Sequence, residues 1–236
     1  MKDNYLIITS KQWNINLFDS LKKSSQDNWF LLTDNGDICL GTINEINPKI
    51  IFFPHWSNYI NEDIYLNYEC IVFHMTDLPF GRGGSPLQNL ISRGIYSTKV
   101  TALKCTKEVD SGDIYLKKPL DLEKGSGEEL YKKASQLAFD MIDEIIDNSI
   151  QPVAQKGRVT HFKRRTPAMS LLPKNLNEKQ TYDYIRMLDA PGYPKAYIEQ
   201  GEYDLIFDKA EFIENSETSD DGGLIAQVKF KKRVIK

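Results

Sequence analysis

Four short and almost continuous hydrophobic runs constrain the fold of this chain more than any other feature. Each run is rich in β-branched and aromatic residues, and segments long enough to form helices separate them. Strands that are buried on both faces of a parallel sheet have this composition. The runs are residues 5–9, 29–33, 50–53 and 71–74. The sequence therefore predicts an α/β fold whose parallel strands are joined by helical crossovers.

A fifth run, residues 100–105, alternates more strongly between apolar and polar side chains. A possible partner strand follows at residues 114–116, and the residues between them, 107–113, contain the Asp, Ser and Gly that favour turns. We expect this hairpin to form an antiparallel edge on the otherwise parallel sheet.

Two later helices carry start signals. Ser85 is followed at once by a proline and three positions on by Gln88, a pattern typical of a capped helix, and Gly94 supplies a stop. Ser126 and Glu129 form a capping box at the start of a longer segment with apolar side chains at helical spacing. We interpret this longer helix as a packing element.

The composition changes after Asn148, where prolines, a glycine and basic residues predict an irregular connection. Beyond it we expect a short helix and three strands, over residues 178–188, 195–198, 203–207 and 224–230, with a polar, mobile loop at 215–223. The predicted architecture is a Rossmann-like, mostly parallel sheet flanked by helices over residues 1–150, a connection over 151–178, and a small C-terminal subdomain of a helix and a β-hairpin over 179–236.

Charge and hydropathy exclude some classes of function. The chain has 30 Lys plus Arg against 33 Asp plus Glu, a formal net charge of -3, so it lacks the overall positive field that non-specific nucleic-acid binding needs. Its hydrophobic runs fall far short of the roughly 20 apolar residues of a membrane span, and the first residues do not resemble a signal peptide. We therefore expect a cytoplasmic protein that binds neither nucleic acid nor membrane.

The three cysteines, Cys39, Cys70 and Cys105, are odd in number, widely spaced and set in or beside apolar runs. Free, buried thiols in a reducing compartment fit this pattern better than disulfides or a zinc site. We expect no metal site.

The clearest candidate for a catalytic residue is His74, at the end of the fourth hydrophobic run. A loop containing Gly81, Gly83 and Gly84 follows and leads to the predicted helix at Ser85, so the imidazole lies where open α/β sheets bind ligands. Such a loop lets backbone N–H groups approach a bound carbonyl or anion. A histidine at a strand end is also often purely structural, and this segment alone leaves both interpretations open.

A second candidate, Asp110, lies in the predicted hairpin turn. A carboxylate at this position is able to hold the imidazole of His74 in one tautomer and raise its basicity. Alternatively Asp110 only helps Ser111 and Gly112 to form the turn. The spacing of the residues does not separate these interpretations.

Taken together, these two segments resemble the folate-dependent formyltransferase family. Residues 74–86 match the pattern His-x-[ST]-x-Leu-Pro-x-x-Arg-Gly-x-x-Pro, and residues 109–113 match [LV]-Asp-[ST]-Gly-Asp in the family's order and spacing. The flanking segments 55–60 and 162–167 agree with the family as well, so the resemblance covers about residues 45–210.

The resemblance implies transfer of a formyl group from N10-formyltetrahydrofolate to an amine. By the family pattern the catalytic residues are His74 and Asp110. The implied cofactor-binding residues are Asn58, Tyr59, Ile60, Gly84, Thr106, Val109 and Asp110, and the implied substrate-binding residues are Thr76, Arg164 and Arg165. A guanidinium group matches phosphate oxygens, so the two arginines suit a diphosphate.

The length of the tail favours one branch of the family. The family members that act on methionyl-tRNA carry a full additional C-terminal barrel, and the roughly 60 residues after the connection are too few for one. Residues 185–198 resemble the short tail of the sugar-nucleotide N-formyltransferases instead. We therefore expect a nucleotide-linked 4-amino-4,6-dideoxy sugar as the acceptor, and the tail strands leave room for a homodimer.

One position departs from the family pattern. The family has an Asn two residues before its histidine, which donates a hydrogen bond to the formyl oxygen, whereas this chain has Val72. Losing one such donor typically costs on the order of 100-fold in rate. A folate-binding module without turnover therefore remains an alternative, as does a formyltransferase for a peptide-type or ribonucleotide amine.

Overall fold

The computed structural model describes residues 2–213 and 223–233. The chain forms two compact units that interleave along the sequence. Unit 1 comprises Met1–Gly83, Thr98–Leu120 and Tyr131–Phe162, and unit 2 comprises Gly84–Ser97, Asp121–Leu130 and Lys163–Lys236. From the sequence we expect domain boundaries at residues 150 and 178, where the composition changes. In the structure each unit combines three separate segments of the chain.

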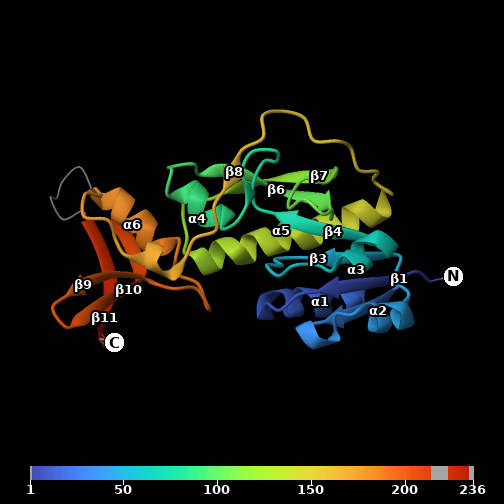
Figure 1. The fold of residues 1–236 in the computed structure, drawn as a ribbon, viewed down its shortest axis with the longest axis horizontal. Helices are drawn as coiled ribbons and strands as arrows, with labels where there is room; N and C mark the ends of the chain where they lie inside the picture. Colours follow the sequence, from blue (N-terminus) through green and yellow to red (C-terminus); the bar gives the residue numbers. More distant parts are fainter. Residues whose placement is uncertain (1, 214–222, 234–236) are drawn as a thin grey trace. The chain divides into compact units, whose positions relative to one another are not determined.

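A six-stranded sheet forms the centre of unit 1 (Figure 1). Its strands are β1(Asn4–Ile8), β2(Asn28–Leu32), β3(Ile50–Phe53), β4(Glu69–His74), β6(Ser97–Lys104) and β7(Ile114–Asp121), in the order β2-β1-β3-β4-β6-β7. The pairs β1–β2, β1–β3 and β3–β4 are parallel, whereas β4 and β6 are antiparallel. The predicted mostly parallel sheet with an antiparallel edge is confirmed.

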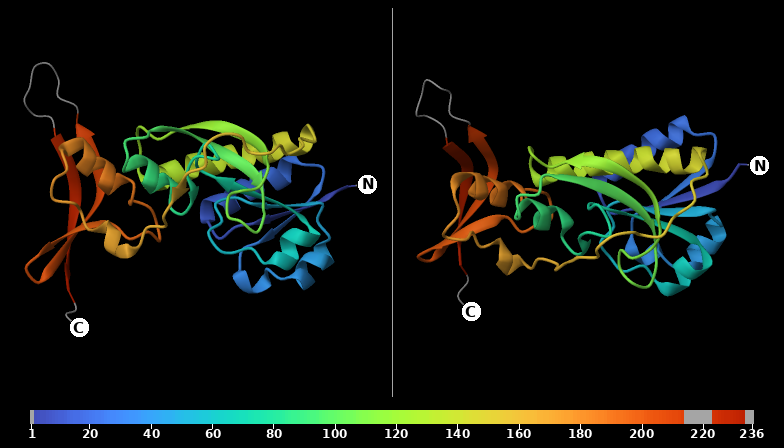
Figure 2. Two further views of the ribbon diagram at one scale, coloured as in Figure 1. Left: turned by 45° about the horizontal axis from the view of Figure 1, so that its top comes forward. Right: turned by 90° about the horizontal axis from the view of Figure 1, so that it is seen from above.

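Helices cover both faces of this sheet. The helices of unit 1 are α1(Gln12–Ser24), α2(Leu40–Ile46), α3(Glu62–Asn67) and most of α5(Gly127–Asp147). Ile43 of α2 and Ile64 of α3 join the buried cluster that contains Leu6 and Phe53 of the sheet. On the other side α1 and α5 lie together (Figure 2), and Trp13 Nε1 of α1 donates to Ser135 Oγ at 3.0 Å. The period-two pattern of the strands therefore divides the core into two layers.

The two predicted helix starts have different outcomes. The capping box is confirmed for α5, because the backbone N–H of Ser126 donates to Glu129 Oε2 at 2.8 Å and Ser126 Oγ accepts from Glu129 N. The predicted cap on α4(Pro86–Ile91) is wrong: Ser85 has φ 53° and its side chain makes no cap hydrogen bond. Its hydroxyl instead accepts the N–H of Arg165 at 3.0 Å, which is a long-range contact. The helix ends at Ile91, three residues before Gly94.

Unit 2 contains the predicted short helix and antiparallel strands. Its elements are α4, η2(Pro167–Ser170), α6(Glu178–Arg186), β9(Ala196–Gln200), β10(Tyr203–Ile213) and β11(Gly223–Lys232), and the sheet order is β11-β10-β9. Tyr182 of α6 contacts the ring of Phe212 in β10, which packs the helix on the sheet. Of the predicted loop at 215–223, residues 215–222 lie outside the described residues, and Gly223 begins β11.

Unit 2 contains a buried ion pair. Arg186, 1% exposed, donates to Asp183 Oδ1 at 2.6 Å and to the carbonyl groups of Leu122 and Gly125. Tyr96 donates its hydroxyl to the second oxygen of Asp183. Because every charge in this group is hydrogen bonded, burial of the pair does not leave an uncompensated ion.

The cysteines differ in their surroundings. All three are free, as expected, but Cys39 is exposed and Cys105 is only partly buried, so the expectation of three buried thiols is correct only for Cys70. Cys39 is the residue directly before α2, and it is exposed although Ile38 beside it packs against the core. Within residues 2–213 and 223–233, no helix is long and apolar enough to cross a membrane, and no cluster of His, Cys, Asp and Glu is suited to a metal ion.

Candidate active site

His74 is the last residue of β4 and lies at the carboxyl edge of the sheet of unit 1. Its side chain is buried, with 7% of the residue exposed. Nε2 lies 2.8 Å from the carbonyl oxygen of Gly81. A carbonyl oxygen only accepts hydrogen bonds, so Nε2 carries a proton in this arrangement. The neutral ring therefore has its basic lone pair on Nδ1.

Asp110 faces this second nitrogen. Its Oδ2 lies 3.4 Å from Nδ1 of His74 and also accepts the backbone N–H of Gly83 at 2.8 Å. The backbone of Asp110 is left-handed, with φ 56°, a conformation that costs free energy in a residue with a side chain. Two segments far apart in sequence thus bring a carboxylate to face Nδ1 of the imidazole.

The glycine-rich loop is packed closely against the chain. Gly81 has φ 75°, and a Cβ built on it lies 2.7 Å from the ring of Phe162. Phe162 belongs to β8(His161–Phe162), which pairs in parallel with β5(Arg82–Gly83). Only glycine combines this backbone conformation with such close packing, so Phe162 fixes the carbonyl group that binds His74.

The predicted cofactor- and substrate-binding residues differ in their exposure. Thr76 is fully buried and donates to the carbonyl oxygen of Gly81 at 3.4 Å, and Ile60 belongs to the core. Thr106 and Val109 are exposed on the loop before Asp110, and Val109 is 62% exposed. The loop of Asp110 is therefore open to a ligand, whereas the side chain of Thr76 reaches the site only through Gly81.

The basic segment expected to bind substrate is partly engaged within unit 2. A Cβ built on Gly84 lies 2.5 Å from the Cβ of Arg164, so Arg164 fills the open side of this glycine. The guanidinium of Arg165 donates to Tyr184 Oη at 2.7 Å and to the carbonyl oxygen of Met169. Arg164 is exposed, whereas Arg165 is partly buried.

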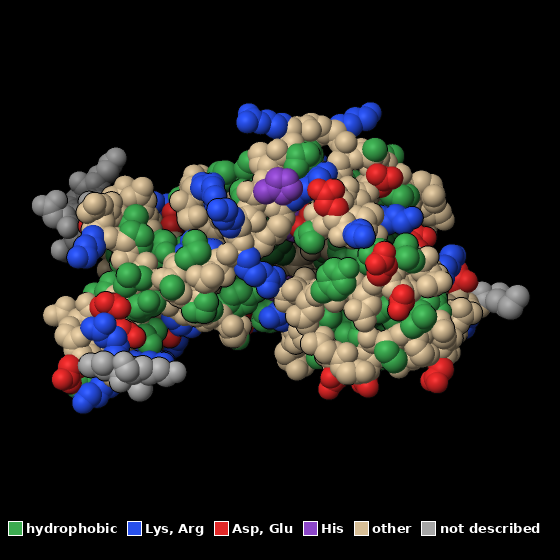
Figure 3. Space-filling model, in the orientation of Figure 1, with side chains coloured by type: hydrophobic (Ala, Val, Ile, Leu, Met, Phe, Trp, Pro, Cys, Tyr) green, Lys and Arg blue, Asp and Glu red, His purple; other side chains and the backbone are tan. Residues whose placement is uncertain are grey.

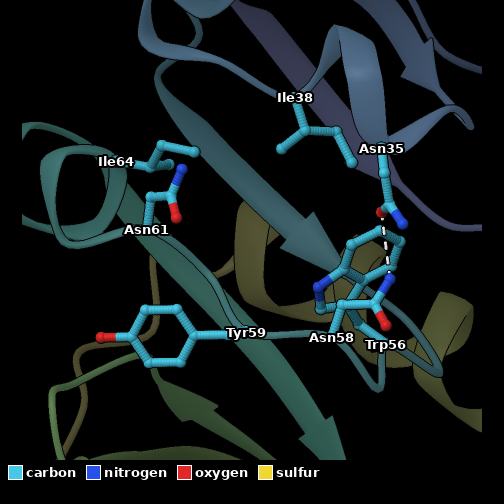
Figure 4. Close-up of a pocket in the computed structure, with 7 residues that line it drawn as sticks. All are labelled: Asn35, Ile38, Trp56, Asn58, Tyr59, Asn61 and Ile64. Carbon is cyan, nitrogen blue, oxygen red and sulfur yellow. Dashed lines mark hydrogen bonds between the residues drawn. The ribbon is translucent and has the colours of Figure 1, made fainter.

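A pocket of about 180 Å³ lies at the carboxyl ends of β2 and β3 in unit 1 (Figure 4). It is lined by Asn35, Ile38, Trp56, Asn58, Tyr59, Asn61 and Ile64. Asn58 donates to Asn35 Oδ1 at 3.0 Å, and the buried indole N–H of Trp56 has no hydrogen-bond partner among residues 2–213 and 223–233. Tyr59 is 69% exposed. The pocket is thus lined by three side-chain amides, two aromatic rings and the indole N–H donor. Such a lining suits a planar heterocycle with polar groups at its edges.

Sequence reasoning missed two residues beside Asp110. Arg82 is 9% exposed and donates through Nη2 to Gln155 Oε1 at 2.9 Å. Gln155 in turn donates to the carbonyl oxygens of Asp110 and Gly112. Gln155 lies in the segment that the sequence identifies only as an irregular connection, and local pattern contains no signal for its contacts. Arg82 is part of the family motif, but its partner is visible only in the folded chain.

A family model described as "Methionyl-tRNA formyltransferase, C-terminal domain" matches residues 167–231. A solved structure described as methionyl-tRNA formyltransferase from Clostridium thermocellum is 43% identical, with a TM-score of 0.91, and the match covers 98% of this chain and 100% of that one. The chain belongs to the formyltransferase family. The family resemblance expected from the sequence is confirmed.

Other members of the formyltransferase family match less of their length or at lower identity. The methionyl-tRNA formyltransferase of Rickettsia massiliae is 31% identical over 123 residues, which are 50% of this chain and 41% of that protein. The chain spans about half the length of the curated relatives it matches. A 4-N formyltransferase from Francisella tularensis has the same fold, with a TM-score of 0.66 at 15% identity, and a match covering 98% of this chain and 99% of that one.

These matches change the expectation about the branch of the family. The relatives with substantial identity are described as methionyl-tRNA formyltransferases, whereas the likeness to sugar N-formyltransferases shows the fold alone. The Clostridium thermocellum chain is matched over its whole length, so a chain of similar size also carries the methionyl-tRNA name. The length of the tail therefore does not separate the two branches.

Proposed function

We propose that this protein transfers a formyl group from N10-formyltetrahydrofolate to a primary amine. The observation that carries this proposal is the arrangement of His74, Asp110 and Gly83, in which a buried imidazole with a fixed tautomer faces a hydrogen-bonded carboxylate. Family membership supports the same reaction.

The residues of this chain supply proton transfer. An amine that attacks a formyl carbon must lose a proton, and a positioned imidazole typically contributes 10²–10⁴-fold by accepting it. In the tautomer that Gly81 fixes, Nδ1 of His74 is the accepting atom, and the carboxylate of Asp110 stabilises the imidazolium that forms. Val72 lies on the same face of β4 as His74, and its side chain donates no hydrogen bond to the developing oxyanion.

The folate donor is proposed to bind along residues 58–60 and the exposed loop of residues 106–110. The carboxyl ends of β3 and β4 lie at one edge of the sheet, which brings the pocket of Figure 4 and His74 to that edge. The unused indole N–H of Trp56 and the amides of Asn58 and Asn61 fit the polar edge of a pterin, and Ile38 fits its apolar face. When bound, N10-formyltetrahydrofolate supplies the activated formyl group.

Methionyl-tRNA is the first acceptor to test. Its support is the 43% identity to the Clostridium thermocellum protein over essentially the whole chain, together with the family model over residues 167–231. On the face drawn in Figure 3, Lys and Arg side chains are interspersed with Asp and Glu, and the net charge is -3. Binding of a tRNA would thus depend on local contacts more than on the overall field of the protein.

A nucleotide-linked amino-dideoxy sugar is the second candidate acceptor. The observation that favours it is the exposed Arg164, which packs against Gly84 at the end of the glycine-rich loop. A guanidinium at this place suits a diphosphate. The likeness in fold to sugar N-formyltransferases is compatible with this acceptor.

Incubation of the purified protein with N10-formyltetrahydrofolate and each acceptor, followed by mass spectrometry, tests the proposal. The expected product is the acceptor with one hydrogen replaced by a formyl group, and His74→Ala should abolish its formation. Saturable binding of the folate without turnover of any amine would contradict the proposal and indicate a binding module. Release of tetrahydrofolate at the same rate with and without an acceptor would indicate a hydrolase.

A further inference from the structure

Gln155 connects the two loops that surround the carboxylate of Asp110. It lies within residues 151–160 of unit 1, which form a loop without helix or strand (Figure 1). Most side chains around it are exposed, but Gln155 itself is partly buried. Nearby, Val153 forms an isolated antiparallel bridge with Ile114, which brings this segment to the end of the hairpin that carries Asp110.

Both the NH2 group and the oxygen of the Gln155 side chain form hydrogen bonds. Nε2 donates to the carbonyl oxygen of Asp110 at 2.9 Å and to that of Gly112 at 2.8 Å. Oε1 accepts from Arg82, at 2.9 Å from Nη2 and at 3.3 Å from Nε. Two of these four bonds hold one loop and two hold the other, so the side chain acts as a cross-link between them.

Both sets of hydrogen bonds affect the position of the Asp110 carboxylate. On one side Gln155 binds the carbonyl group of Asp110 itself, whose left-handed backbone has to be held by its surroundings. On the other side it binds Arg82, which directly precedes Gly83, the residue whose N–H donates to Asp110 Oδ2. Gln155 therefore sets the position of the carboxylate and of its hydrogen-bond donor relative to one another.

We propose that Gln155 is a positioning residue that holds the carboxylate of Asp110 toward Nδ1 of His74. The inference rests on the proposed function, since it assigns Gln155 a role in the same reaction. The competing explanation is that Gln155 only fastens the loop of residues 151–160 to the rest of unit 1.

The first experiment compares the same substitution at two glutamines. Gln155→Glu keeps an acceptor for Arg82 but removes both N–H donors and sets a carboxylate against two carbonyl groups. Gln151→Glu makes the same change in charge at an exposed position four residues earlier. We expect kcat to fall about 10- to 100-fold in Gln155→Glu and to change less than about twofold in Gln151→Glu. Equal activity in the two variants would overturn the proposal.

A double-mutant cycle separates positioning from fastening. If Gln155 acts through Asp110, then Gln155→Glu should lower kcat by less than about threefold when Asp110→Asn is already present. A role in fastening alone would lower kcat by the same factor in both backgrounds, and that result would also overturn the proposal.

A spectroscopic readout keeps the test independent of turnover. The chain has three histidines, so the imidazole nitrogen-15 signals of His74 can be assigned by comparison with His74→Asn. At fixed pH we expect these signals to move in Gln155→Glu toward their positions in Asp110→Asn, and not to move in Gln151→Glu. Unmoved signals in a folded Gln155→Glu protein refute the positioning role, whereas absence of turnover in the wild type with moved signals refutes only the proposed function. If Gln155→Glu fails to fold by circular dichroism, Gln155→Met takes its place in every comparison.

Discussion

The carboxylate of Asp110 lies 3.4 Å from Nδ1 of His74, and the opposite nitrogen of the same ring is bound to the carbonyl oxygen of Gly81 at 2.8 Å. The imidazole therefore has an acceptor on each side. Only the doubly protonated ring donates a hydrogen bond at both nitrogens. In the proposed reaction, this arrangement would stabilise His74 after it has accepted a proton from the attacking amine.

Replacing Asp110 by Asn is expected to remove this stabilisation without disturbing the loop. Asn tolerates the left-handed backbone of Asp110 and keeps an oxygen that accepts the N–H of Gly83. We expect kcat to fall by about 100-fold or more with little change in thermal unfolding. Steady-state kinetics and a melting curve measure both. A fall of less than about threefold would show that the carboxylate has no role in the reaction.

Val72→Asn tests the departure from the family pattern. Residues 72 and 74 share a face of β4, so an Asn at 72 presents a donor beside His74. We expect kcat to rise by about tenfold or more, while exchange of a partly buried apolar side chain for an amide lowers stability by about 1–3 kcal/mol. Val72→Thr, which keeps the branched shape, serves as the packing control. An Asn variant that folds but is no faster would locate the formyl oxygen elsewhere.

Gly112→Ala tests how tightly the Asp110 loop is packed. A Cβ built on Gly112 lies 1.9 Å from the backbone oxygen of Lys104, and a backbone atom does not move aside as a side chain does. We expect the loop to shift, lowering stability by about 1–3 kcal/mol and reducing kcat together with it. Gly223→Ala is the matched control, because none of the heavy atoms of the described residues lies within 4 Å of its Cβ. Urea unfolding and kinetics on both variants provide the comparison, and equal stability would contradict the close approach.

His55 predicts how stability depends on pH. Burial lowers the pKa of His55 from 6.5 to about 3, with a further contribution from nearby Lys11. The unfolded chain therefore binds one more proton than the folded chain between these values. The stabilisation is complete above about pH 6.5 and is lost as pH falls toward 3, at up to about 1.4 kcal/mol per pH unit.

Urea unfolding between pH 4 and 7 measures this dependence. His55→Phe keeps an aromatic ring between Trp13 and Tyr131 but cannot be protonated, so its stability should fall less steeply with acid than that of the wild type. His161→Phe, at an exposed position, should leave the slope unchanged. Identical slopes in all three proteins would mean that His55 titrates normally.

The sequence by itself determined the sheet, its edge and the position of the main motif. Strands β1 to β4 were predictable because continuous apolar runs have one stable environment, the inside of a helix-covered parallel sheet. The places of His74 at a strand end and of Asp110 in a turn were predictable because the apolar run and the turn composition are local signals. Local composition likewise identified the capping box at Ser126, whose two partners are three residues apart.

Only the tertiary structure decided how the candidate site is held together. The hydroxyl of Ser85 does not cap its own helix but accepts the N–H of Arg165. The side chain of Gln155 forms hydrogen bonds with Asp110 and Arg82, which are more than 40 residues away in the sequence. The exposure of Cys39 likewise follows from where α2 lies and not from its neighbours in sequence. Periodicity and turn chemistry report interactions within a few residues, whereas these contacts depend on loop conformations that are fixed only when distant segments pack. These long-range contacts are therefore visible in the folded chain and not in its local sequence patterns.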